Sequence, residues 1–177
     1  MLNITHNTYE EHQHFRQWWV WIILVLVELL CVTGVVVQIF MGQDVGTEPV
    51  PIWIMILYAL FILALLFMFY RLRLDIIIDR TGIRYRWYPF QGNGRYIQWS
   101  EIESTEVRKY KPIREYGGWG VRFGITRRGS AHNVSGNMGL QLVLKNRKHI
   151  LLGTQHPEKL REFLNDREQS VEGSPLE

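Results

Sequence analysis

Two nearly continuous apolar stretches decide the fold of this chain: residues 18–41, WWVWIILVLVELLCVTGVVVQIFM, and residues 52–70, IWIMILYALFILALLFMFY. They contain 24 and 19 residues, and about 20 helical residues cross the roughly 30 Å hydrocarbon core of a bilayer. Neither stretch has the polar stripe at helical spacing that a water-facing helix carries. The two stretches therefore predict a transmembrane helical hairpin over residues 18–70.

Basic residues near the ends of the two spans predict their orientation, because Lys and Arg are retained on the cytoplasmic side of a membrane. Arg16 precedes the first span, and Arg71 and Arg73 follow the second. The connecting residues 42–51 carry acidic but no basic side chains, namely Asp44 and Glu48. We therefore expect both termini to be cytoplasmic.

The polar segment that precedes the first span, residues 1–17, lacks the basic start and the small-residue cleavage site of a signal peptide. The first span is therefore expected to be retained. Cys31, the single cysteine of the chain, lies within it and has no intramolecular partner for a disulfide.

Charge divides the chain sharply at the end of the second span. Residues 1–70 contain one Arg against five acidic residues, a net charge of −4, whereas residues 71–177 contain 19 Lys and Arg against 12 Asp and Glu, a net charge of +7. Basic side chains close to the anionic inner leaflet each contribute about 1 kcal/mol to membrane attraction. The basic half is therefore expected either to lie close to lipid or to present a solvated basic surface that follows the positive-inside rule.

Short β-rich runs separated by turns follow the second span. In residues 83–88, Ile83, Tyr85 and Trp87 alternate with Arg84, Arg86 and Tyr88, which predicts a strand with one basic face. Turns are expected at residues 80–82, 91–94 and 145–147. The predicted strands are residues 72–79, 83–88, 95–99, 101–110, 119–125, 131–134, 139–144 and 149–153.

A helix of roughly three turns is predicted to begin at Pro157. Leu160, Phe163 and Leu164 would form its single apolar stripe, at positions i, i+3 and i+4. Residues 167–177 have few side chains to pack and are expected to be disordered. The β-rich domain is therefore assigned to residues 71–166, which is long enough for one modest core.

Three motifs in this domain carry a resemblance to a known family: GGWG at residues 117–120, NVSGN at 133–137, and GTQ at 153–155 followed by Pro157. In this order and spacing, residues 72–166 resemble the PH-like domain of bacterial membrane proteins of unknown function, many of which place two membrane helices before the domain. The resemblance implies a partly open β-barrel of about seven strands with a C-terminal helix, in an α+β protein of the inner (cytoplasmic) membrane. It implies no catalytic residues, cofactor or ligand.

The residues that could carry chemistry do not form a recognisable set. Residues 117–120 lack both the dinucleotide-binding spacing and the Lys-Ser/Thr ending of a phosphate loop, and their glycines are expected to serve a bulge or packing around Trp119. His12 and His14, with His6 further back, have no additional ligands at metal-binding spacing. No Ser or Cys has an arranged base. We therefore expect no enzyme activity, no cofactor and no metal.

Glu28 is the only ionisable residue well inside a predicted span, and such residues are functional candidates because their charge is costly in lipid. It would either accept a proton or pair across a dimer, or else remain protonated and hydrogen-bonded within the hairpin, for example to Thr33 of a neighbouring chain or to a local carbonyl.

Basic residues near the membrane tether are the candidate contacts to a lipid or a partner. Nucleic-acid binding would use similar charge with interleaved aromatics, but the aromatics of residues 83–88 are better explained as the core face of a strand, so no nucleic-acid partner is expected. The candidate residues are Arg71, Arg73, Arg80, Arg84 and Arg86.

Two hypotheses of function follow from these observations. In the first, the cytoplasmic domain of a non-enzymatic membrane protein is an interaction module for anionic lipid headgroups or for a protein partner. In the alternative, the chain is a structural subunit that assembles, as a homo-oligomer for example, through its spans and its domain surface.

Overall fold

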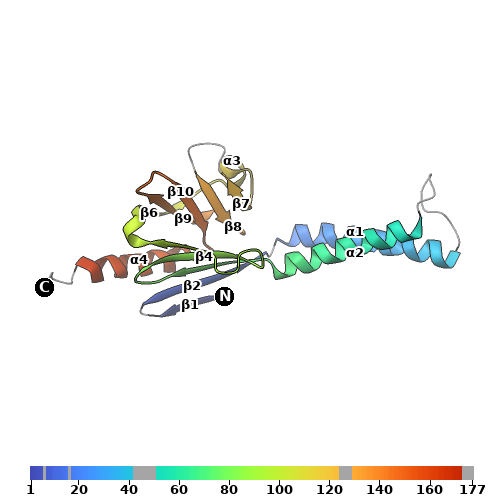
Figure 1. Ribbon diagram of the computed structural model, residues 1–177, viewed down its shortest axis with the longest axis horizontal. Helices are drawn as coiled ribbons and strands as arrows, with labels where there is room; N and C mark the ends of the chain where they lie inside the picture. Colours follow the sequence, from blue (N-terminus) through green and yellow to red (C-terminus); the bar gives the residue numbers. More distant parts are fainter. Residues whose placement is uncertain (6, 16, 42–50, 124–128, 173–177) are drawn as a thin grey trace. The chain divides into compact units, whose positions relative to one another are not determined.

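The computed structural model of the protein describes residues 1–5, 7–15, 17–41, 51–123 and 129–172 (Figure 1). The chain forms two compact units. One is the helical unit Arg16–Arg71, and the other, called here the β unit, combines Met1–Phe15 with Leu72–Glu177. The predicted connecting segment with Asp44 and Glu48 and the residue Arg16 lie outside the described residues.

The helical unit contains α1 (Trp18–Met41) and α2 (Ile52–Arg71), which pack against each other. Both are long and apolar enough to cross a membrane, with a mean hydropathy of 2.8 and only 6% of the residues in each span buried. Gly34 and Ile62 are buried in this unit, while most other apolar side chains of the helices are exposed. The predicted helices therefore exist at the predicted positions, and their surfaces are as apolar as lipid contact requires.

The first sheet of the β unit has the order β1-β2-β3-β4-β5, with antiparallel neighbours throughout. The alternation predicted for residues 83–88 is confirmed, because Ile83, Tyr85 and Trp87 are buried while Arg84 is exposed. The strands are β1 (Leu2–Thr5), β2 (Thr8–His14), β3 (Arg73–Ile78), β4 (Gly82–Tyr88) and β5 (Arg95–Gln98).

The amino-terminal segment differs from expectation, because the structure makes it part of the β unit. Strand β2 pairs with β3 from Tyr9 opposite Ile78 to His14 opposite Arg73. Its buried face consists of Tyr9, Glu11 and Gln13. Two of these three side chains are polar, which explains why hydrophobic alternation did not reveal the strand.

The second sheet has the order β6-β9-β10-β8-β7 and contains one parallel pair, β8 with β10. The turn predicted at residues 145–147 joins β9 to β10, and Arg147 adopts a positive φ of 64° in it. A short helix that was not predicted, α3 (Pro112–Tyr116), follows β6, and the residues after Phe123 as far as 128 lie outside the described part. The strands are β6 (Ile102–Lys109), β7 (Gly120–Phe123), β8 (Ser130–Asn133), β9 (Met138–Leu144) and β10 (His149–Gly153).

The hydrophobic core of the β unit joins side chains of both sheets to the C-terminal helix α4 (Pro157–Glu172). Leu74 and Trp87 of the first sheet, and Leu140 of the second, share this core with Leu160 and Leu164 of α4. The predicted stripe of α4 is therefore confirmed. The structure as described is an α+β protein with two sheets and a terminal helix.

The C-terminal helix is longer than the sequence predicted. It was expected to end near residue 166, but it continues to Glu172. The guanidinium of Arg167 lies 3.6 Å from the centroid of the Trp99 ring, and such cation–π contact stabilises the added turn. Residues 173–177 of the predicted disordered tail lie outside the described residues.

Candidate functional site

Three of the predicted basic residues gather on the outward face of the first sheet. Because side chains alternate along a strand, Arg73 of β3 and both Arg84 and Arg86 of β4 point away from the core. The register places Arg86 opposite Asp75 and Arg84 opposite Ile77. We call this surface, formed by His12, Arg73, Asp75, Arg84 and Arg86, the basic face.

Asp75 is the electrostatic centre of the basic face. Its side chain is 1% exposed and is paired with three groups: His12 Nδ1 at 2.7 Å and Arg73 Nε at 3.2 Å, both to Oδ1, and Arg86 Nε at 2.8 Å to Oδ2. Burial alone would raise the pKa of Asp75, but the hydrogen bonds from His12 and Arg86 and the charge of Arg73 outweigh it and lower the pKa. Asp75 therefore fixes the geometry of the basic face and neutralises only part of its charge.

Arg84 supplies the least compensated cation of the basic face. Its guanidinium lies 5.5 Å from the ring centroid of Tyr96 on β5, and no ion pair holds it within the residues that the structure describes. A hollow of about 520 Å³ adjoins Arg84, Arg86 and Asp75. Ile77, Tyr96 and the turn residues Gly92–Gly94 complete its lining, so two arginine side chains and one carboxylate border the hollow.

The other two predicted basic residues do not join this face. Arg71 is the last residue of α2 and belongs to the helical unit, where its guanidinium lies 5.7 Å from the Phe67 ring centroid. Arg80 lies in the turn between β3 and β4 and lines a different hollow of about 660 Å³, together with Lys159 and Phe163 of α4. The five predicted residues are therefore not one cluster.

An exposed aromatic residue, Phe90, marks one end of the first sheet and was missed by the sequence analysis. Tyr88, the last residue of β4, lies opposite Arg73, which follows the end of α2 by two positions. Phe90 lies two positions after Tyr88 and is 67% exposed. The signal in the sequence was a Pro-Phe pair in a turn, where a large apolar residue has no core to enter.

Glu28 lies in α1 with one carboxyl oxygen shielded from solvent. Among the described residues, Oε2 has no hydrogen-bond partner. The neighbouring-chain pairing with Thr33 that the sequence suggested stays a prediction, because the structure is of one chain. Glu28 is therefore an acidic residue in a helix made mostly of apolar residues.

A second carboxylate, that of Glu11, is buried in the β unit without being paired to a cation in the described residues. Its Oε2 accepts hydrogen bonds from Tyr9 Oη at 2.6 Å and Thr154 Oγ1 at 2.7 Å, and its Oε1 accepts one from the Gln155 amide at 2.7 Å. Burial first, and then the charge of Glu11, raise the pKa of Tyr9. This network fastens β2 to the segment that precedes α4, which is a structural role.

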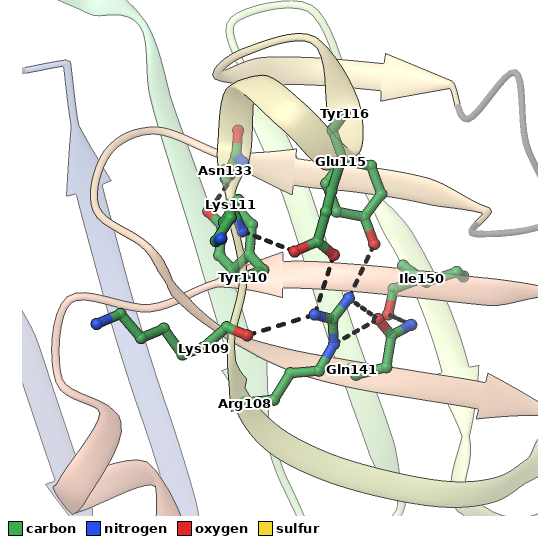
Figure 2. Close-up of polar contacts among 9 residues, drawn as sticks. All are labelled: Arg108, Lys109, Tyr110, Lys111, Glu115, Tyr116, Asn133, Gln141 and Ile150. Atoms are coloured by element: carbon green, nitrogen blue, oxygen red, sulfur yellow. Dashed lines mark hydrogen bonds and ion pairs between the residues drawn. The ribbon is translucent and has the colours of Figure 1, made fainter.

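A third polar cluster surrounds Arg108 of β6 (Figure 2). Its guanidinium donates to Glu115 Oε2 at 3.1 Å, to Gln141 Oε1 at 3.0 Å and to Tyr116 Oη at 3.3 Å. The second oxygen of Glu115 accepts the Lys111 amide at 2.7 Å. Figure 2 shows that residues from β6, α3 and β9 converge on this one guanidinium.

In the part of the chain that the structure describes, no group of three or more His, Cys, Asp or Glu side chains could hold a metal ion. His12 instead contacts Asp75, while His6 lies outside the described residues. Of the Gly-rich residues 117–120, Gly117 ends α3 at a φ of 75° and Gly120 begins β7.

Comparison of the sequence with models of protein families found no match, and comparison with curated proteins found none either.

Proposed function

We propose that this chain is an integral protein of the inner membrane, in which α1 and α2 cross the bilayer as a hairpin with both termini cytoplasmic. In this proposal the β unit is a PH-like, non-enzymatic interaction module that contacts anionic lipid headgroups. Two mostly antiparallel sheets followed by a terminal helix support the PH-like part of the proposal.

The main support for the topology in this proposal is the pairing of β2 with β3. Strand β2 ends just before α1, and β3 begins just after α2, yet the two strands lie side by side in one sheet. Both flanks of the hairpin must therefore be on one side of any membrane that the helices cross. The end of the sheet formed by these flanks would lie next to the headgroups, because only a few residues separate it from the spans.

The chemistry of this sheet end suits a lipid surface. Arg73 supplies a cation, Phe90 an exposed aromatic ring, and Tyr88 a ring that lies 4.9 Å from the Arg73 guanidinium. Basic side chains attract anionic headgroups within a Debye length, and aromatic side chains favour the membrane interface. Arg84 and Arg86 extend the same charge along the sheet.

The test uses the full chain, because a fragment that begins at residue 71 lacks β1 and β2. Cys31 is replaced by Ser, so that an introduced cysteine is the only thiol available for labelling. Phe90→Cys would be labelled with an environment-sensitive fluorophore and the protein reconstituted into vesicles of phosphatidylcholine, with and without phosphatidylglycerol. Ile113→Cys is the matched control, since Ile113 on α3 is 70% exposed, much like Phe90.

We expect lipid-borne quenchers to reach the label at position 90 more effectively when phosphatidylglycerol is present, and to reach the label at position 113 less. Equal quenching at the two positions would contradict the lipid proposal. So would quenching at position 90 that is the same with and without phosphatidylglycerol. A chemical cross-link from position 90 to another protein in native membranes, combined with absent quenching, would favour the protein-partner alternative.

A further inference from the structure

A hollow of about 700 Å³ lies over the Arg108 cluster of the second sheet. It is separate from the basic face, which belongs to the first sheet. Residues of β6, α3, β9 and β10 border it. Its lining includes Arg108, Lys111, Arg114, Glu115, Gln141 and His149.

The floor of this hollow is held by several hydrogen bonds, and these occupy most of its acceptor atoms. Arg108 is held by Glu115, Gln141 and Tyr116, and its Nη1 also reaches the Lys109 carbonyl at 3.4 Å. Gln141 Oε1 is taken by Arg108, while its Nε2 donates to the Ile150 carbonyl at 3.3 Å. Figure 2 shows the Glu115 carboxylate directed to Arg108 and to the Lys111 amide.

The rim, in contrast, carries cations without acidic partners. Lys111 and Arg114 are exposed, and neither forms an ion pair with a carboxylate of the described residues. His149 of β10, opposite Val143 of β9, adds a third basic side chain. Because Glu115 already balances Arg108, the hollow keeps two formal positive charges from Lys111 and Arg114.

We propose that this hollow binds a phosphate group, in the form of a phosphate monoester dianion. Lys, Arg and His offer donors, whereas the nearby acceptors are occupied, so the ligand must supply acceptor oxygens. A monoester supplies three of them and about two negative charges near pH 7, which match Lys111 and Arg114. A carboxylate would leave one of these cations uncompensated. The guanidinium of Arg114 suits phosphate oxygens, which it can contact through two N–H groups.

The experiment measures binding to the full chain, in detergent for the soluble probe and reconstituted in bilayers for the lipid probe, and the two probes separate the sources of the group. Inorganic phosphate tests a soluble phosphate. Vesicles containing phosphatidic acid, which carries a terminal phosphate monoester, are compared with vesicles containing phosphatidylglycerol, an anionic lipid whose phosphate is a diester, to test a lipid phosphate monoester. The test variant is the double substitution Lys111→Gln and Arg114→Gln. Its matched controls are Lys145→Gln and Lys148→Gln, which remove the same charge from the exposed turn between β9 and β10.

We expect saturable binding of at least one probe. The Lys111 and Arg114 variant should bind it about tenfold or more weakly, because the loss of one charge-assisted contact lowers affinity by roughly tenfold. In the controls the affinity should change less than about twofold. Because all four residues are exposed, the thermal transition should stay unchanged in both variants. Binding of inorganic phosphate assigns the site to a soluble phosphate, and selective binding of phosphatidic acid assigns it to lipid. Absence of binding by both probes, or equal weakening in the controls, would overturn the proposal. Neither result depends on whether Phe90 contacts lipid.

Discussion

His14 of β2 lies directly opposite Arg73 of β3, so the two segments that flank the helical hairpin are neighbours in one sheet. The amino-terminal residues therefore belong to the β unit rather than forming a separate tail.

Cysteines at the two facing positions should form a disulfide. Facing strand residues have Cα atoms about 4.5–5.5 Å apart, which lies within the range that a disulfide bridges. In a Cys31→Ser background, His14→Cys combined with Arg73→Cys should therefore cross-link on mild oxidation and migrate faster in non-reducing electrophoresis. The control pair, His14→Cys with Ile77→Cys, is four positions out of register and should not cross-link. Equal cross-linking of both pairs would contradict the register.

The Glu11 network predicts a cost for removing a single hydroxyl group. Tyr9→Phe deletes the 2.6 Å hydrogen bond to the buried carboxylate, and it should lower the free energy of unfolding of the β unit by about 1–3 kcal/mol. Hydrogen exchange of β2 and β3 amides in the full chain would report the loss.

Tyr96→Phe is the matched control for this hydroxyl deletion. The Tyr96 hydroxyl also forms a hydrogen bond, to Thr81 Oγ1 at 2.7 Å, but at an exposed site. Its removal should cost less than about 1 kcal/mol. If Tyr96→Phe lowered the free energy of unfolding as much as Tyr9→Phe, burial of the Glu11 network would not increase the cost of losing a hydrogen bond.

The extent to which the sequence predicted the fold depended on where each element finds its partners. The helices were predicted because their own apolar length is sufficient, and β4 because its alternation is local. Strand β2 was missed because Glu11 occupies a buried position by bonding Thr154, 143 positions later. The last turn of α4 was missed for a similar reason, since Arg167 contacts the distant Trp99.

The sequence likewise predicted those parts of the candidate site that depend on a local pattern, and missed those that depend on distant partners. Alternation along β4 was enough to place Arg84 and Arg86 on one face. The sequence did not indicate that Asp75 would bind Arg73, Arg86 and His12 together, because His12 reaches Asp75 only through the pairing of β2 with β3. Arg80 was grouped with the others by nearness in sequence, whereas the turn after β3 carries it to α4.

Replacing Asp75 should change both stability and the charge of the basic face. Asp75→Asn removes the common partner of His12, Arg73 and Arg86, and should cost about 1–3 kcal/mol at neutral pH. The pKa of Asp75 lies below its ordinary value of 3.8 in the folded protein, so its stabilisation is present above pH 3.8 and is lost as the pH falls through the lower folded value. Acid unfolding of the Asp75→Asn protein should therefore be less steep below pH 3.8.

The same substitution should strengthen attraction to anionic vesicles, because it adds one net positive charge to the basic face. The control is Glu103→Gln, which makes the same charge change at an exposed position of β6. If Glu103→Gln increased vesicle attraction as much as Asp75→Asn, net charge rather than the basic face would account for the effect.

His132 should make the β unit sensitive to mild acid. Trp87 Nε1 donates to its Nδ1 at 3.1 Å, so the neutral ring carries its proton on Nε2. Burial, followed by the charge of Arg95, lowers the pKa of His132 from 6.5 to about 4. Between these two values the unfolded chain binds the proton and the folded chain does not. Stability should thus be complete above pH 6.5 and decline as the pH falls toward 4, by about 3 kcal/mol in total.

Denaturant unfolding of the full chain in detergent, measured between pH 7 and pH 4, would test this decline. His132→Gln keeps a side chain with an acceptor for Trp87 but does not titrate, so it should flatten the profile in this range even if it lowers stability at pH 7. His156→Gln lies outside the buried contact with Trp87 and should retain the decline. A His132→Gln protein with the same pH dependence as the unmodified chain would show that protonation of another group limits stability.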